Sequence, residues 1–309
     1  MGGSGGGSGG FEDYPPSRVQ EKVREAEEAA AEGQFLPRLA ALLDGYLAVA
    51  NQRDTRLVQH RLDGIKAALR DELEEGFDLL FGGSVAKHTY VDGISDIDSL
   101  LVFREASDAT PGELKQQVAK RINQALPDAR VSTGRLAVTV GYRDGMEVQL
   151  IPAARTGRGL RVPSWHGDRW SRIDPVGFKA ALTKCNEANS GKLIPTIKLA
   201  KAINANLLAS RQLTGYHIES LGIAAFRQYS GEKTTSRMLP YFCEEISKRV
   251  LSPVRDSTGQ SVHGDEYLGR IGSKDRKLVA QIFERIAKRM RNATAAQSES
   301  QWRQLFEGD

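Results

Sequence analysis

The sequence contains very little cysteine. Cys185 and Cys243 are the only two cysteines among 309 residues, and neither stands in a Cys-X-X-Cys motif or a Cys/His cluster. This spacing argues against a structural zinc site. We therefore expect two partly buried, reduced thiols, as in a cytoplasmic protein.

Long apolar runs are also lacking. No stretch of about 18 apolar residues occurs, so the sequence predicts no transmembrane helix. The chain starts with a Gly/Ser linker, MGGSGGGSGG (1–10), rather than with a charged and then apolar signal peptide. We interpret this linker as artificial, and we expect a cytoplasmic protein without a membrane partner.

The excess of one charge sign is small. Lysine and arginine number 43 against 39 aspartates and glutamates, which leaves a net charge of +4. Hydrophobic residues make up 40% and charged residues 27% of the chain, as is ordinary for a globular protein. A mild positive balance suits an anionic ligand, such as a nucleotide or a nucleic acid, and requires neither.

Helical and strand patterns alternate in the first half of the chain. Apolar residues at spacings of three and four predict helices, and β-branched alternation predicts strands. The Asp144-Gly145 pair predicts a hairpin turn, and Pro152 predicts the end of the strand that follows it. The expected helices cover 19–75 and 111–126, and the expected strands cover 129–142 and 146–153.

Helical patterns dominate the second half. Residues 154–175 are rich in Gly, Pro and Arg and predict an irregular crossover. We therefore expect an α+β fold with an N-terminal lobe over 11–170 and a helical lobe over 171–309. The expected helices of this half cover 176–189, 192–209, 216–229, 235–251 and 274–292.

The segment FGGSVAKHTYVDGISDIDSLLVF (81–103) carries the strongest chemical signal. Asp96 and Asp98 are two residues apart, so on a strand they point to the same face. Two adjacent carboxylates repel each other, and a hard divalent cation such as Mg²⁺ or Mn²⁺ relieves that repulsion. Upstream, the backbone amides of Gly82 and Gly83 and the hydroxyl of Ser84 suit a phosphate-binding turn. Together these residues predict metal-assisted phosphoryl or nucleotidyl transfer.

This segment resembles the GS…DxD signature of the DNA polymerase β-like nucleotidyltransferase superfamily. The resemblance is greatest to the bacterial cGAS/DncV-like nucleotidyltransferases (CD-NTases), which make cyclic oligonucleotide second messengers in the CBASS systems of anti-phage defence. Weaker likenesses support it at EVQLIPA (147–153), TIKLAKAIN (196–204), GYHIESL (215–221) and QWRQLF (301–306). The resemblance implies a polymerase β-like lobe with a mixed sheet, packed against a C-terminal helical lobe, with the active site in the cleft between them.

The resemblance also implies roles for further residues. Lys198 and Lys201 match a basic pair near the triphosphate, although they could instead form a solvated helix face. Tyr216 matches an aromatic residue that stacks on a base, although packing is the ordinary role of such a tyrosine. His217 is not needed by this chemistry, and we expect a hydrogen-bonded or surface histidine. Trp302 and Phe306 are four residues apart and predict a hydrophobic dock for the C-terminus.

One position departs from the family pattern. The family has a third carboxylate three residues before the proline, where this sequence has Gln149. Glu147 lies two residues earlier on the same strand face, about 6 to 7 Å away. We assign the third metal-binding and catalytic carboxylate to Glu147, with Gln149 as the open alternative.

The sequence thus predicts a Mg²⁺- or Mn²⁺-dependent synthase of a cyclic di- or trinucleotide from nucleoside triphosphates. A regulatory protein or a nucleic-acid activator is the expected further partner. Two alternatives remain: a nucleotidyltransferase that acts on tRNA ends or a small molecule, and a catalytically silent nucleic-acid-binding or sensing member of the superfamily.

Overall fold

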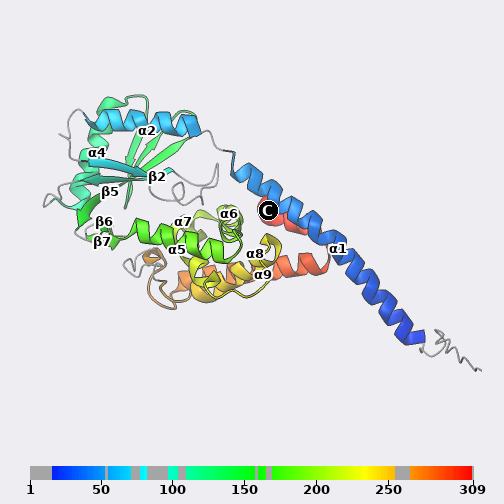
Figure 1. Ribbon diagram of the computed structural model, residues 1–309. Helices are drawn as coiled ribbons and strands as arrows, with labels where there is room; N and C mark the ends of the chain where they lie inside the picture. Colours follow the sequence, from blue (N-terminus) through cyan, green and yellow to red (C-terminus); the bar gives the residue numbers. More distant parts are fainter. Residues whose placement is uncertain are drawn as a thin grey trace, which may run out of the picture.

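A computed structural model describes residues 16–52, 55–70, 77–81, 97–103, 109–156, 159–164, 169–254 and 265–307. The chain forms a lobe built on a β-sheet and a lobe of helices (Figure 1). This confirms the expected α+β class. None of the helices in these ranges is long and apolar enough to cross a membrane.

The described strands form one mixed sheet. The order is β1-β2-β5-β4-β3, and β6 and β7 extend it from the far end of β5. The central pair, β2 and β5, is parallel, and every other pair is antiparallel. The strands are β1 (Phe77–Phe81), β2 (Ile97–Phe103), β3 (Arg130–Thr133), β4 (Val138–Gly141), β5 (Glu147–Thr156), β6 (Gly159–Pro163) and β7 (Trp170–Ile173).

The sequence predicts a single strand over 129–142, and the structure shows two. β3 and β4 are antiparallel neighbours joined by a tight turn in which the Gly134 amide donates to the Ala137 carbonyl at 2.8 Å. The buried Lys115 ammonium donates to the carbonyls of Gly134, at 2.9 Å, and Arg135, which fixes this turn from outside the hairpin. The predicted hairpin at Asp144-Gly145 is confirmed, and Gly145 adopts a φ of +85°.

Pro152 does not end its strand, contrary to expectation. β5 continues to Thr156 and pairs with β2 along one side. On the other side of β5, the pairing with β4 ends at Leu150 and the pairing with β6 starts at Ala154. Pro152 therefore lies in the gap between these two partner strands. A proline is tolerated where one side of a strand has no partner, because its missing N–H breaks no ladder bond there.

The stretch 154–175 is not an irregular crossover either. It contains the end of β5 and the antiparallel strands β6 and β7. Leu160, Val162 and Ile173 supply the alternating apolar residues, but the glycines, prolines and arginines between them obscure this pattern. The packing of these side chains against β2 and β5 decides the strand conformation.

Two helices cover one face of the sheet. α2 (Thr55–Arg70) and α4 (Pro111–Ala125) pack on alternate residues of β2, β4 and β5, and α2 lies above the sheet in Figure 1. Thr110 and Glu113 form a capping box that starts α4 at Pro111. The buried residues of this core include Leu62, Ile65, Val118, Ile122, Leu101, Phe103, Val148 and Leu150.

The opposite face of the sheet has a smaller apolar cluster. Leu100 and Val102 of β2 contact Ala153 of β5 and Leu160 of β6. Because residues alternate between the faces of a strand, position 98 belongs with Leu100 and Val102 rather than with the face under α2 and α4.

The helical lobe confirms the helices expected from the sequence, with several ends moved by two to four residues. The helix expected over 192–209 ends at Ala205, and a short 3₁₀ turn, η2 (Ala209–Arg211), follows. Trp302 is completely buried and Phe306 stacks on Tyr46 at 4.3 Å, so the expected hydrophobic dock is confirmed. The helices are α5 (Pro175–Ala188), α6 (Leu193–Ala205), α7 (Gly215–Phe226), α8 (Thr235–Arg249), α9 (Lys274–Ala295) and α10 (Glu299–Glu307), with a 3₁₀ turn, η3 (Glu266–Leu268).

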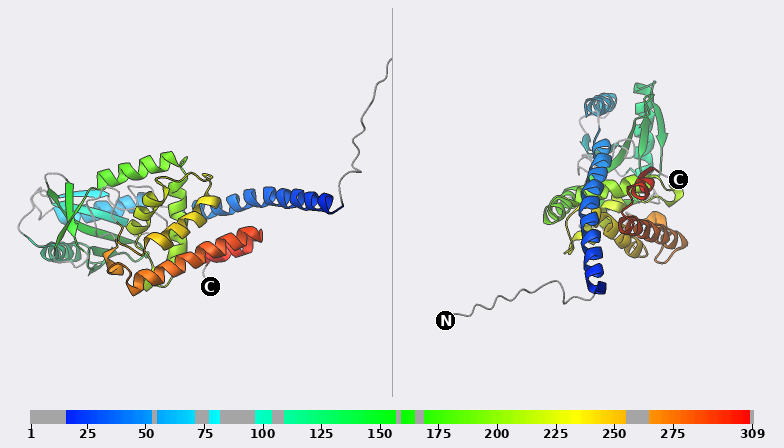
Figure 2. Two further views of the ribbon diagram at one scale, coloured as in Figure 1. Left: turned by 90° about the horizontal axis from the view of Figure 1, so that it is seen from below. Right: turned by 90° about the vertical axis from the view of Figure 1, so that its right-hand side faces the viewer.

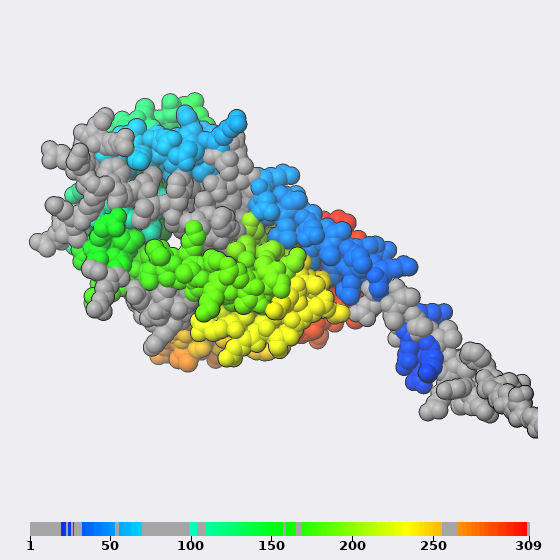
Figure 3. Space-filling view, viewed as in Figure 1, coloured from blue at the N-terminus to red at the C-terminus, as the bar shows by residue number. Residues whose placement is uncertain are grey.

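The first helix, α1 (Pro16–Ala50), does not join the sheet lobe, where the sequence places it. Phe35, Leu39, Leu43 and Leu47 are buried in the core of the helical lobe. The surface of α1 adjoins that of the helical lobe in Figure 3, and its first turns project away from the body in both views of Figure 2. An apolar stripe in the sequence shows that a helix packs against something, but it does not show which lobe the helix packs against. The boundary between the two lobes therefore could not be predicted without the tertiary contacts of α1.

Both cysteines are buried, free thiols. Burial raises the pKa of the Cys185 thiol and raises that of Cys243 to about 12. A thiol with a raised pKa is a poor nucleophile, so both belong to the packing of the helical lobe.

Candidate functional site

The start of β2 lies against the start of β5. In the parallel register, Ile97 is the neighbour of Val148 and Asp98 is the neighbour of Gln149. Neighbours in a parallel pair belong to the same face of the sheet. The backbone thus brings one predicted metal ligand, Asp98, beside the residue that replaces the family's third carboxylate.

Glu147 lies one residue before the paired segment. It is the neighbour of Gly141 on β4, and its side chain is exposed. A Cβ added to Gly141 would lie 3.7 Å from the Glu147 Oε1 atom, so the carboxylate lies over β4, on the side of β5 away from β2. The assignment of Glu147 as third ligand stays a prediction, and the register makes Gln149 the nearer position.

Four predicted site residues lie outside the described residues: Asp96, Gly82, Gly83 and Ser84. Among the residues that are described, no group of three His, Cys, Asp or Glu side chains could hold a metal ion. The Gln149 amide oxygen, on the residue beside Asp98, and the Glu147 carboxylate, at the start of β5, are nevertheless the hard oxygen ligands that Mg²⁺ and Mn²⁺ prefer.

Lys198 projects from the middle of α6. Its ammonium donates to the Asn51 Oδ1 atom at the end of α1. Burial lowers the pKa of Lys198, and the nearby charge of Lys201 lowers it further. An ammonium has three donors, so Lys198 keeps two for a phosphate, whose negative charge would favour the protonated form.

Lys201 is placed differently from Lys198. Its side chain is 4% exposed, and its Nζ atom forms an ion pair at 2.8 Å with Oε1 of Glu219, which is 1% exposed. A Cβ added to Gly215 would lie 3.3 Å from the same Nζ atom, so the ammonium lies under the first turn of α7. The alternative that Lys201 belongs to a solvated helix face is therefore wrong. Its contact with a triphosphate stays a prediction.

Tyr216 lies in that first turn of α7. Its ring packs against Phe178 of α5, with 4.9 Å between the ring centroids. The side chain is only partly buried, and it belongs to the rim of the helical core. Packing is thus its observed role here, and stacking on a base stays a prediction.

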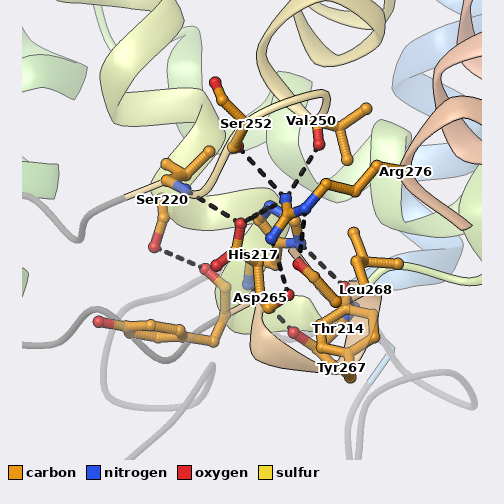
Figure 4. Close-up of polar contacts among 12 residues, drawn as sticks. Thr214, His217, Ser220, Val250, Ser252, Asp265, Tyr267, Leu268 and Arg276 are labelled. Carbon is orange, nitrogen blue, oxygen red and sulfur yellow. Dashed lines mark hydrogen bonds and ion pairs between the residues drawn. The ribbon is translucent and has the colours of Figure 1, made fainter. Parts of the chain in front are cut away.

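A buried polar network supports the same turn of α7, and the sequence alone did not reveal it. Thr214 caps α7, and its amide donates to the Tyr267 hydroxyl at 3.0 Å. That hydroxyl lies 2.9 Å from Nδ1 of His217 and, since it already accepts from Thr214, it has its own proton to donate there. Figure 4 shows these residues converging with Asp265 and Arg276.

Arg276 holds the network together from α9. Its guanidinium forms a 2.7 Å ion pair with Oδ2 of Asp265 and donates to the carbonyls of Val250, Ser252, Gly269 and Asp265 (Figure 4). Arg276 and Asp265 are each 1% exposed. The hydrogen-bonded role expected for His217 is confirmed. The sequence did not predict a buried role for Arg276, because an arginine on a helix with many basic residues is ordinarily expected to be solvated.

Solved structures of bacterial CD-NTases resemble this fold. CdnG of Bradyrhizobium diazoefficiens, in complex with GTP, matches with a TM-score of 0.69 at 14% identity, over 88% of this chain and 96% of that one. DncV of Vibrio cholerae, a cyclic AMP-GMP synthase in complex with a linear intermediate, matches with a TM-score of 0.60 at 12% identity, over 93% and 89% of the chains.

A third structure contains a partner protein. CdnC of Escherichia coli MS115-1, in complex with HORMA-deltaN, matches with a TM-score of 0.60 at 14% identity, over 88% of this chain and 96% of that one. No protein-family model and no curated protein matches the sequence. The solved structures therefore establish that this chain has the fold of the CD-NTases.

Proposed function

We propose that this chain, which has the polymerase β-like fold of the CD-NTases, is a metal-dependent nucleotidyltransferase that joins nucleoside triphosphates into a cyclic oligonucleotide. The observation that carries the proposal is the pairing of Asp98 with Gln149 at the start of the central parallel strands. Asp98, the second aspartate of the Asp-X-Asp segment, thus lies at the start of β2, in a fold whose solved members include a cyclic AMP-GMP synthase, and this supports the proposal. The expected products are a cyclic di- or trinucleotide and pyrophosphate.

The chemistry needs few protein groups. A ribose hydroxyl of the acceptor attacks the α-phosphorus of the donor, a new P–O bond forms, and the bond to pyrophosphate breaks. The hydroxyl proton passes to a carboxylate, which we assign to Glu147 because Gln149 cannot accept it. Asp96, Asp98 and Glu147 would hold Mg²⁺ or Mn²⁺, which when bound offsets the charge of the triphosphate.

The donor phosphates need positive and polar groups. The Gly82 and Gly83 amides and the Ser84 hydroxyl are proposed to bind them, together with Lys198. The neighbours solved with GTP or a linear nucleotide intermediate support nucleoside triphosphates as substrates. The HORMA complex of CdnC supports a regulatory protein as a further partner. A role in anti-phage defence is proposed from the sequence resemblance alone.

Gln149 favours a second candidate function. A neutral amide next to Asp98 weakens a metal site, so the chain could be a catalytically silent member that binds or senses nucleic acid. Such a protein would bind polymers in a salt-dependent way and release no pyrophosphate. A transferase for tRNA ends or small molecules would instead release pyrophosphate only when its acceptor is added.

The deciding experiment is incubation of the protein with ATP, GTP, CTP, UTP and Mg²⁺, followed by mass spectrometry of the small products. We expect a cyclic product, and none from Asp98→Asn, because losing one metal ligand costs several kcal/mol of transition-state stabilisation. A folded Asp98→Asn protein with wild-type turnover would refute the proposed site. Absence of pyrophosphate under all conditions would support the silent alternative.

A further inference from the structure

The strands at the far end of β5 carry an unusual number of arginines. Residues 155–173 contain five arginines, no lysine and a single acidic residue, Asp168. The structure describes four of the five: Arg155, Arg161, Arg169 and Arg172. Neither the proposed reaction nor the packing of the sheet requires this charge.

Two of the arginines are direct cross-strand neighbours. In the antiparallel pair of β6 and β7, Arg161 lies opposite Arg172. Like charges directly opposite each other destabilise a sheet. Arg172 is exposed, and the Arg161 guanidinium lies over the ring of Trp170, 4.9 Å from its centroid. The Nε atom of Arg161 is buried and has no hydrogen-bond partner in the described part of the chain.

This surface is separate from the proposed active site. Leu160, Val162 and Ile173 pack toward the small cluster of Leu100 and Val102, so Arg161 and Arg172 belong to the other face of the sheet. Arg161 is the neighbour of Ala154 on β5, which lies five positions along the strand from Gln149, a distance of about 17 Å. β7 also has no partner but β6 among the described strands, so Arg172 lies on an edge strand, with Arg161 on the strand beside it.

We infer that the arginine surface of β6 and β7 binds the phosphate backbone of a single-stranded nucleic acid. Guanidinium groups bind phosphates through paired hydrogen bonds, which explains arginine in place of lysine. A phosphate between Arg161 and Arg172 would turn their repulsion into attraction. Arginines beside a partly exposed tryptophan match the combination of charge and aromatic surface that binds single strands.

The test measures binding without any nucleoside triphosphate, so it does not depend on the proposed activity. Fluorescence anisotropy follows a fluorescein-labelled single-stranded RNA over a range of salt concentrations. Arg161→Gln/Arg172→Gln is expected to weaken binding at least about tenfold and to reduce the slope of log Kd against log salt by about 1.4, or about 0.7 for each lost phosphate contact.

A matched control removes the same charge elsewhere. Arg143 and Arg249 are exposed and ion-paired with Asp128 and Glu245, so Arg143→Gln/Arg249→Gln should leave the slope unchanged. Equal slopes in the two double variants would overturn the inference, as would stronger arginine-dependent binding of polyglutamate than of RNA. If the first variant unfolds, Arg172→Gln alone, at an exposed position, should still lower the slope by about 0.7.

Discussion

Lys201 shows how strongly the surroundings of a residue change the role that its sequence predicts. In the sequence it is half of a basic pair spaced for a polyphosphate, but in the structure it is buried against Glu219 beneath the first turn of α7. The side chain of Lys201 is 4% exposed and that of Glu219 is 1% exposed, so either charge without its partner would carry a large desolvation cost. The pair therefore fixes α6 against α7, and with them the position of Tyr216.

This pair can be tested by substitution. Lys201→Met leaves Glu219 buried without its ammonium and is expected to lower the free energy of unfolding by about 3 to 5 kcal/mol, measured by urea titration. Lys201→Met/Glu219→Leu should recover most of that loss, because no buried charge remains. A wild-type urea midpoint for Lys201→Met would contradict the structural role. A higher KM for nucleotide in the stable double variant would show that Lys201 also contacts the triphosphate.

At the scale of elements, the register of β5 decides which side chain can supply a third carboxylate. The parallel pairing sets position 149 beside Asp98, while Glu147 is exposed at the start of the strand. The strand is held on both sides, by β2 and by β4, so a shift of one residue would turn its buried Val148 and Leu150 outward. The register is therefore strongly specified.

We expect Glu147→Gln to reduce synthesis about 100-fold or more, because it removes the carboxylate that we assign as the acceptor of the hydroxyl proton. Glu147→Gln/Gln149→Asp should restore activity, since it places a carboxylate at the position beside Asp98. The measurement is the rate of pyrophosphate release at saturating nucleotide. Full activity of the single Glu147→Gln variant would exclude Glu147 from the reaction.

At the scale of the whole molecule, the helical lobe joins distant parts of the chain. Its core takes Phe35 and Leu39 from the N-terminal helix and Trp302 and Leu305 from the C-terminal one. The network of His217, Tyr267, Asp265 and Arg276 ties α7 to the segment before α9 in the same lobe (Figure 4). A change in charge at one buried member thus affects the stability of the lobe.

Stability should depend on pH through His217. Burial lowers the pKa of His217 from 6.5 to about 4, which Asp265 opposes and Arg276 reinforces. The unfolded chain therefore takes up a proton near pH 6.5, whereas the folded chain does so only near pH 4. The stabilisation is complete above pH 6.5 and falls by about 3 kcal/mol as the pH drops to about 4.

Urea titrations between pH 4 and 8 measure this loss. Carboxylates with lowered pKa values also make the folded protein less stable in acid. The wild type is therefore compared with the His217→Asn variant, whose asparagine does not titrate between pH 4 and 8. The variant should show a smaller decline between pH 6.5 and 4 than the wild type. Identical declines in the two proteins would mean that His217 is accessible to protons in the folded state.

The sequence by itself determined the two-lobe α+β class, most of the helices, the hairpin at Asp144-Gly145 and the docking of Trp302. These features depend on local periodicity, turn chemistry and apolar spacing, which neighbouring residues encode. The Asp-X-Asp segment was also visible, because its residues are close in sequence. The roles of these residues in catalysis stay predictions.

Only the tertiary structure decided the extension of β5 past Pro152, the strands β6 and β7, and the lobe to which α1 belongs. Each depends on a partner far away in the sequence, and local patterns do not specify partners. The same reason applies to Lys201, whose charge became buried because Glu219 reaches it from another helix. It applies equally to Arg161 and Arg172, which are eleven residues apart in the chain and face each other only because β6 and β7 pair.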